Sequence, residues 1–345
     1  MKSLPTSLLV KAVSWSAKRA RVNGTFCSLD GPQEKSNIYI SMEKFEVTIL
    51  GCGSATPTLR HNPSAQVVNM RDKLSLVDCG EGTQLQMRLR KIKFMALRNV
   101  FVSHLHGDHC LGLVGLISTF GLLGRTKAFH VYAPAGLQNV LNAQMELFCH
   151  KLEFEVVFHA IDTTVNAMVY EDRTMEVWTL PLRHSMPCCG FLFREKPSLP
   201  HINREMTDFY NIPVCYLPGI KAGKDWVCED GTIVPNGRLV TPAVPPRSYA
   251  YCSDTSFMPS LASLVKGVDL LYHEATYPDG AEIKARLRCH STAGQAAEIA
   301  RLAGVKRLMI GHYSATVDDV AVLVEQARKV FPDTIAAQEG LVVKV

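Results

Sequence analysis

The stretch Ser103-His104-Leu105-His106-Gly107-Asp108-His109 carries the strongest signal in the sequence. It offers three imidazoles and one carboxylate, and neutral histidine nitrogens with carboxylate oxygens are donors that Zn²⁺ prefers. The stretch follows an expected strand at residues 99–103 and precedes an expected helix at residues 111–122, which places it on a loop at a strand end. Because side chains on such a loop can converge, the pattern predicts a metal site.

One loop cannot fill two metal sites, so further donors must come from elsewhere in the chain. His184, Asp254 and His312 each follow an expected strand. Any one of them alone is more simply explained as a capped or buried polar residue. Strands that end at one sheet edge bring such residues together, and the three then complete a set of seven donors with the histidine loop.

From residue 45 onward, short β-rich runs alternate with longer helical stretches. Strands are expected at residues 46–50, 66–70, 74–78, 99–103, 130–133, 153–158, 176–180, 249–252, 268–273 and 307–310. Helices are expected at residues 83–93, 111–122, 136–148, 258–265, 292–302 and 317–330. This mixture predicts an α/β protein in which helices cover sheets.

Residues 196–246 break this rhythm. They hold eight prolines, show little periodicity and carry charges of both signs. A segment this long is not an ordinary connection inside a compact domain. We expect it to be a functional excursion or a small insert.

The composition is that of a globular chain with 345 residues and a formal net charge of +5. No apolar run approaches the roughly 20 residues that a membrane crossing needs. Residues 1–41 hold six Lys and Arg against two acids and so carry nearly all the excess charge. We expect this acid-poor segment to be a disordered or non-native extension, or a transit peptide, ahead of a catalytic domain at residues 42–345. Net charge is therefore no sign of RNA binding.

The 11 cysteines are an odd number and include no C-x-x-C pair. This pattern predicts neither a disulfide framework nor a cysteine zinc site, and it favours the reducing cytoplasm. Five histidines lack a motif context and are expected in packing or surface roles, namely His61, His130, His150, His159 and His201.

Several further motifs support a family resemblance. They are Leu-Gly-Cys-Gly-Ser at residues 50–54, Asp-Cys-Gly-Glu-Gly-Thr-Gln at 78–84, Ser-Asp-Thr at 253–255, His-Glu-Ala-Thr at 273–276 and His-Ser-Thr-Ala at 290–293. With the histidine loop, they make the chain resemble the metallo-β-lactamase superfamily from about residue 43 to the C-terminus. The histidine loop marks only the superfamily. The run at 78–84 and the segments around Glu274 and His290 resemble its short-form ribonuclease Z branch.

This resemblance implies a four-layer αββα sandwich with a protruding arm inserted at about residues 196–246. It also implies two Zn²⁺ ions per chain, although Mn²⁺ and Fe²⁺ suit the same donors. The implied ligands are His104, His106 and His184 on one ion, Asp108, His109 and His312 on the other, and Asp254 bridging both. Paired metal ions stabilise the attacking and phosphoryl oxygens of an in-line displacement.

Three residues are expected to act in catalysis. Asp108 would orient the attacking water or take its proton. His290 would donate a proton to the ribose 3′-oxygen, and Glu274 would hold its imidazole in the required tautomer. The alternative for His290 is a structural role at a helix N-terminus. Asp78 and Glu81 are expected either to accept hydrogen bonds from ligand imidazoles or to shape a turn.

The resemblance implies an endoribonuclease that cleaves at the 3′ end of tRNA precursors and removes the 3′ trailer. Precursor tRNA would be its partner, the protein would form a homodimer, and it would act in the cytoplasm without a membrane. Five basic residues after the 78–84 run either track phosphates or form a solvated helix face. They are Arg88, Arg90, Lys91, Lys93 and Arg98.

Two other functions stay open. The same fold serves small-molecule phosphodiesterases and arylsulfatases, and the arm bears on this choice. Where ribonuclease Z usually has a Gly-Pro turn after Ile-Pro, this chain has Val214-Cys215-Tyr216, and its arm is charge-balanced. A more remote alternative is a noncatalytic RNA-binding module on a degenerate hydrolase scaffold.

Overall fold

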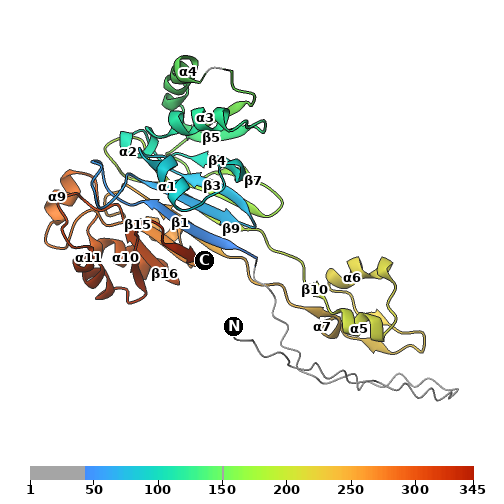
Figure 1. Ribbon diagram of the computed structural model, residues 1–345. Helices are drawn as coiled ribbons and strands as arrows, with labels where there is room; N and C mark the ends of the chain where they lie inside the picture. The colour runs from blue at the N-terminus through green and yellow to red at the C-terminus, as the bar shows by residue number, and fades with distance from the viewer. Residues whose placement is uncertain (1–42, 150) are drawn as a thin grey trace, which may run out of the picture. The chain divides into compact units, whose positions relative to one another are not determined.

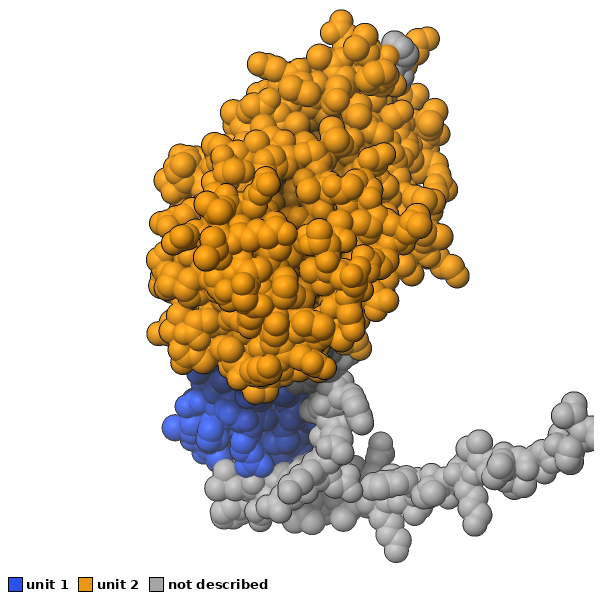
Figure 2. Space-filling model, turned by 90° about the vertical axis from the view of Figure 1, so that its left-hand side faces the viewer, with its two compact units in different colours: residues 1–39, 199–242 blue, residues 40–198, 243–345 orange. Residues whose placement is uncertain are grey.

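The computed structural model describes residues 43–149 and 151–345 (Figure 1). The expectation for residues 1–41 therefore lies outside the described part of the chain. The chain divides into two compact units (Figure 2). In the described part, the smaller unit is Leu199–Pro242, and the larger unit takes up the residues on either side of it.

The larger unit contains two sheets of seven strands each. The first has the order β18-β1-β2-β3-β4-β5-β6. Its strands are β1 (Phe45–Gly51), β2 (Ala65–Met70), β3 (Lys73–Val77), β4 (Leu97–Phe101), β5 (Phe129–Pro134), β6 (Val156–Ile161) and β18 (Val342–Lys344). Pairing is antiparallel from β18 to β3 and parallel from β3 to β6.

The second sheet has the order β17-β16-β15-β14-β9-β8-β7. Its strands are β7 (Met168–Glu171), β8 (Met175–Pro181), β9 (Cys189–Glu195), β14 (Ser248–Cys252), β15 (Leu270–Glu274), β16 (Arg307–Gly311) and β17 (Thr334–Ala336). Pairing is antiparallel from β7 to β14 and parallel from β14 to β17.

Helices cover the outer face of each sheet. On the first sheet they are α1 (Thr83–Leu89), α3 (Leu113–Leu122) and α4 (Gly136–Phe148), and on the second α8 (Leu261–Leu264), α10 (Ala293–Ala303) and α11 (Val320–Arg328). The one-turn α2 (Gly107–Cys110), the 3-10 turn at Phe94–Ala96 and α9 (Glu282–Leu287) complete the larger unit. The predicted four-layer αββα sandwich is confirmed (Figure 1).

Strand periodicity explains how the layers hold together. Along β2, Val67 packs with the outer helices, whereas its neighbour Val68 packs between the sheets. This alternation follows from the two-residue period of a strand. Between the sheets, the ring of Phe101 lies 5.5 Å from the rings of both Phe191 and Phe193, measured between centroids. These contacts join the first sheet to the middle of the second.

Several predicted boundaries are wrong. The helix expected at residues 83–93 ends at Leu89, and Lys91 has a left-handed backbone with a φ of 55°. The strand expected from residue 153 begins at Val156, and the helix expected from residue 317 begins at Val320. Strand β9 was not expected, because its residues are buried on both faces and show no alternation.

The smaller unit is built from short elements. They are β10 (His201–Ile202), α5 (Arg204–Phe209), a 3-10 turn (Val214–Tyr216), α6 (Leu217–Lys221), β11 (Trp226–Val227), β12 (Ile233–Val234), α7 (Asn236–Leu239) and β13 (Val240–Thr241). None of these elements is long enough to give a visible hydrophobic period, which is why the sequence of this segment shows little periodicity. The unit has its own core of Met206, Tyr210, Ile212, Leu217, Ile220, Val234 and Leu239.

Within residues 43–149 and 151–345, none of the helices combines the length and apolar character that a membrane crossing requires.

Candidate active site

The structure brings the seven predicted donors together where strands of both sheets end. The histidine loop follows β4 and continues into α2, which carries Asp108 and His109. His184 follows β8, Asp254 follows β14 and His312 follows β16. Each donor thus stands in the segment that follows a buried strand, so the packed sheets set its position.

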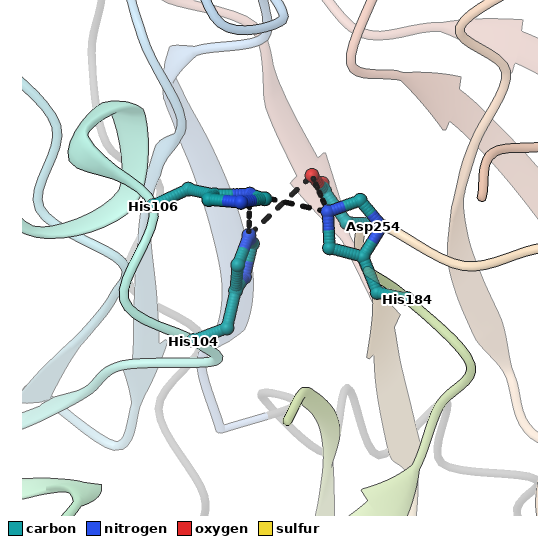
Figure 3. Close-up of side chains that lie close together, drawn as sticks. All are labelled: His104, His106, His184 and Asp254. Atoms are coloured by element: carbon teal, nitrogen blue, oxygen red, sulfur yellow. Dashed lines mark hydrogen bonds and ion pairs between the residues drawn. The ribbon is translucent and has the colours of Figure 1, made fainter. Parts of the chain in front are cut away.

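Four donors form a first group (Figure 3). The Nδ1 atom of His106 lies 3.0 Å from Nε2 of His104 and 3.1 Å from Nε2 of His184. Asp254 Oδ2 lies 3.5 Å from Nε2 of both His104 and His184. Four atoms this close, arriving from three separate loops, can surround one small cation.

The second group consists of Asp108, His109 and His312. Asp108 Oδ2 lies 3.4 Å from His109 Nε2 and 3.5 Å from His312 Nε2. The other oxygen of Asp254, Oδ1, lies 3.4 Å and 3.0 Å from the same two nitrogens. Asp254 therefore presents one carboxylate oxygen to each group.

The residues of the second group fit a divalent metal ion. The buried Nε2 atoms of His109 and His312 have no hydrogen-bond partner among the described residues. The Nδ1 atom of His109 lies 2.7 Å from Asp78 Oδ2, and that of His312 lies 3.1 Å from Thr276 Oγ1. A ring nitrogen that is buried, unpaired and aimed at two carboxylates is what a metal ligand requires.

The charges at this point favour a cation as well. Burial acts to lower the pKa of the His312 imidazole, but Asp254 and Asp108 outweigh it and raise this pKa to about 10. Burial would raise the pKa of Asp108, yet the neighbouring imidazoles of His109 and His312 hold it well below its usual range. The carboxylates of Asp108 and Asp254 thus favour a positive charge between them, which a divalent cation supplies.

Asp78 braces the histidine loop from behind. This fully buried carboxylate accepts hydrogen bonds from Ser103 N at 2.8 Å, Ser103 Oγ at 3.0 Å and Tyr251 Oη at 2.6 Å, besides its contact with His109. Asp78 therefore has the contact that the sequence suggested for it. Glu81 is exposed and lines the cavity described below, and no ligand imidazole in the described part of the chain bonds to it.

We expect Asp78→Ala to lower the free energy of unfolding by about 3 kcal/mol, because it leaves several buried donors unpaired. Tyr251→Phe removes only one hydroxyl of the same network and should cost about 1 kcal/mol. Urea unfolding of both variants measures the difference. Equal stabilities of the two variants would show that Asp78 does not brace the loop.

Gly80 and Ala55 bring backbone against the same loop. A Cβ at Gly80 would overlap the carbonyl oxygen of Asp108, so only glycine permits this approach. The backbone N–H of Ala55 donates a hydrogen bond of 2.7 Å to Asp108 Oδ2. The loop after β1 thereby fixes the orientation of the Asp108 carboxylate.

Glu274 and His290 form a hydrogen-bonded pair beside the donors. His290 Nδ1 lies 2.8 Å from Glu274 Oε1. The buried Glu274 carboxylate also accepts from Thr255 N at 2.8 Å, Thr276 Oγ1 at 2.6 Å and Ser291 N at 3.1 Å. Burial lowers the pKa of His290, but Glu274 outweighs it and raises that pKa. Glu274 therefore orients the imidazole and favours its protonated form.

Four of the donors and His290 share one cavity of about 820 Å³. His106, Asp108, His184, Asp254 and His290 line it. A substrate in this cavity would meet both groups of donors and His290 at once.

Two cations at this cavity were missed by the sequence reasoning. Lys284, on α9, and Arg288, directly after that helix, line it, and Lys284 Nζ lies 4.7 Å from the centroid of the Tyr277 ring. The signal was the run of three basic residues, at positions 284, 286 and 288, just before His290. None of the basic residues predicted at positions 88–98 is among those lining the cavity.

Comparisons with known proteins show the family of the chain. A family model described as "Anti-Pycsar protein Apyc1" matches residues 45–199. Ribonuclease Z of Bacteroides fragilis is 53% identical over 304 residues, which is 88% of this chain and 100% of that protein. The solved structure of the short form of human tRNase Z superposes with a TM-score of 0.63 and 26% identity, over 86% of this chain and 98% of that one.

The fold has more distant relatives too. A metallo-β-lactamase fold protein, YhfI from Bacillus subtilis, superposes with a TM-score of 0.61 at 18% identity, over 88% of this chain and 100% of that one. That likeness concerns the fold alone. The 53% identity over the full length of the Bacteroides protein shows the family as well as the fold. This chain belongs to the ribonuclease Z family.

Proposed function

We propose that the protein is a binuclear zinc-dependent endoribonuclease that cleaves tRNA precursors at their 3′ end and removes the 3′ trailer. The observation that carries the proposal is the Glu274–His290 pair, because His290 lines the same cavity as four of the proposed metal donors. A phosphodiester cleavage needs an acid for its leaving group in addition to metal ions. The relative in Bacteroides fragilis that bears the name ribonuclease Z supports the choice of RNA as substrate.

The proposed metal ligands follow from the two groups of donors. His104, His106 and His184 would hold one Zn²⁺, and Asp108, His109 and His312 the other, with one oxygen of Asp254 on each. Mn²⁺ or Fe²⁺ would suit the same donors. When bound, such ions supply positive charge that stabilises the phosphoryl oxygens of the transition state.

The other side chains around the scissile phosphate transfer protons or bind phosphate. Asp108, oriented by the N–H of Ala55, holds the attacking water and accepts its proton. His290 donates a proton to the ribose 3′-oxygen as that bond breaks, and Glu274 keeps its Nδ1 occupied so that Nε2 is the acid. Lys284 and Arg288 bind neighbouring phosphates at the cavity wall.

The proposal includes a homodimer in the cytoplasm with precursor tRNA as its partner. Leu85 and Leu89 on α1 are 60% and 59% exposed, and such an apolar surface supports contact with a second copy. The buried cysteines Cys52, Cys79, Cys188, Cys189 and Cys252 form no disulfide, which is consistent with a reducing compartment.

The arm separates this function from that of a small-molecule phosphodiesterase. Strands β9 and β14 pair at Arg194 and Ser248, so the chain leaves and re-enters the sheet at neighbouring positions. A short Gly-Ser linker can therefore replace Leu199–Pro242 without disturbing either strand.

We expect this replacement to abolish cleavage of a 3′-extended tRNA and to leave hydrolysis of a small chromogenic phosphodiester unchanged. The reason is that the small diester needs only the cavity, whereas a folded tRNA needs a second contact. Rates on both substrates measure the effect. Full cleavage of the tRNA precursor by the shortened protein would refute a role of the arm, and a wild-type protein that cuts only the small diester would refute the proposed substrate.

A further inference from the structure

A second cluster of metal-type donors lies outside the active site. Cys52 Sγ is 3.4 Å from His61 Nδ1 and 3.6 Å from Glu339 Oε1. His61 Nδ1 is 3.2 Å from Glu339 Oε2. A thiol and an imidazole from the loop after β1 thus meet a carboxylate from the loop after β17.

Such convergence is rare in this protein. Throughout the described ranges, every other set of three or more His, Cys, Asp or Glu donors within reach of one ion belongs to the active site. The cluster is also enclosed, since Cys52 is fully buried and the side chains of His61 and Glu339 are 19% and 8% exposed. Its donors stand 3.2–3.6 Å apart, close to the 3.0–3.5 Å between donors of the two active-site groups.

We propose that Cys52, His61 and Glu339 form a separate Zn²⁺ site. Zinc accepts thiolate, imidazole and carboxylate together, at about 2.3 Å from sulfur and about 2.0–2.2 Å from nitrogen or oxygen. Around a tetrahedral ion at those lengths, donors lie roughly 3.3–3.6 Å apart. The cluster therefore provides three donors at nearly the required spacing, and it lies beyond the proposed catalytic function.

The surroundings allow an ion to enter. His61, Ala337 and Gln338 line a cavity of about 510 Å³ beside α11, which opens the cluster to solvent on the side of His61. Burial raises the pKa of the Cys52 thiol, and the charge of Glu339 raises it further. Zinc binding would displace this proton, as it does at other cysteine sites.

The site would stabilise the loop after β1, which makes hydrogen bonds to Asp108 and to Tyr313, the neighbour of His312. The carbonyl of Cys52 accepts a hydrogen bond of 2.9 Å from the N–H of Tyr313, the residue after His312. Three residues on from Cys52, Ala55 donates to Asp108. An ion on Cys52 thus fixes the loop from which both active-site contacts are made.

Cobalt substitution tests the proposal directly. The active-site donors are all nitrogen and oxygen, so only a cysteine site gives a thiolate-to-cobalt charge-transfer band in the near ultraviolet. We expect this band in the full chain loaded with Co²⁺, its loss in Cys52→Ser and its retention in Cys149→Ser. Cys149 is the matched control, because it is a buried cysteine at the end of α4 that belongs to no cluster of metal-type donors in the described residues.

The number of metal ions bound per chain is a second measurement, which is needed if Cys52→Ser fails to fold. His61 lies at the edge of the cluster, and His61→Gln should bind one metal ion fewer per chain than the wild type. An unchanged metal content in that variant would overturn the proposal. So would Co²⁺-loaded wild type with visible d–d bands but no charge-transfer band, or a band that survives in Cys52→Ser.

Discussion

Asp254→Ala is expected to slow cleavage of a 3′-extended tRNA by about a thousandfold or more. Its two oxygens face different groups of donors, so the substitution removes a ligand from both proposed metal positions. Loss of several kcal/mol of transition-state stabilisation, at about 1.4 kcal/mol per tenfold in rate, gives this magnitude. The rate and the metal content of the purified variant should fall together.

A matched control separates this effect from a general loss of negative charge. Asp318 is an exposed carboxylate that pairs with Arg60 at 3.5 Å on the surface. Asp318→Ala should keep the wild-type rate and metal content, because exposed ion pairs contribute little. An Asp254→Ala variant that retained both its metal and its activity would exclude Asp254 as a bridging ligand.

His290→Ala should lower the rate on the same substrate by about 10²–10⁴-fold, which is the usual contribution of a general acid. Its metal content should stay at the wild-type value, because His290 is not one of the seven proposed ligands, although it lies within reach of an ion held by Asp254 and His312. Hydrolysis of a nitrophenyl phosphodiester should suffer much less, since nitrophenolate leaves without a proton. Rates on the two substrates, with metal content, therefore isolate the acid step.

Glu274→Gln serves as the companion variant. It keeps an oxygen near His290 but removes the charge that raises the pKa of the imidazole. Its rate should fall between those of the wild type and His290→Ala. Loss of metal in His290→Ala would reassign His290 as a ligand, and an equal loss on both substrates would argue against a role as acid.

The donors could be predicted from sequence because their positions depend on local rules. The histidine loop is contiguous, and His184, Asp254 and His312 each follow a strand that its apolar residues reveal. Sheets align strand ends, so residues far apart in sequence meet there. The alternation of strands and helices predicted only sheets covered by helices, and the four layers of the fold followed from the family resemblance.

Other features had no local signal. Strand β9 is central and buried on both faces, so it lacks the alternation by which strands are recognised. Cys52 and Glu339 are 287 positions apart, and His61 was expected only to pack or to face solvent. Their contact depends on how the loop after β1 folds against the loop after β17, which periodicity does not report. Arg288 was overlooked because its run of charges resembles an ordinary solvated helix face.

The most direct test of the proposed function uses a labelled 3′-extended tRNA precursor and the purified full chain. With Zn²⁺ present, we expect a single cut that yields the mature-length tRNA and the intact trailer. A chelator should stop this cleavage, and added Zn²⁺ or Mn²⁺ should restore it. A protein that carries two metal ions per chain, hydrolyses other esters and leaves the precursor uncut would contradict the account.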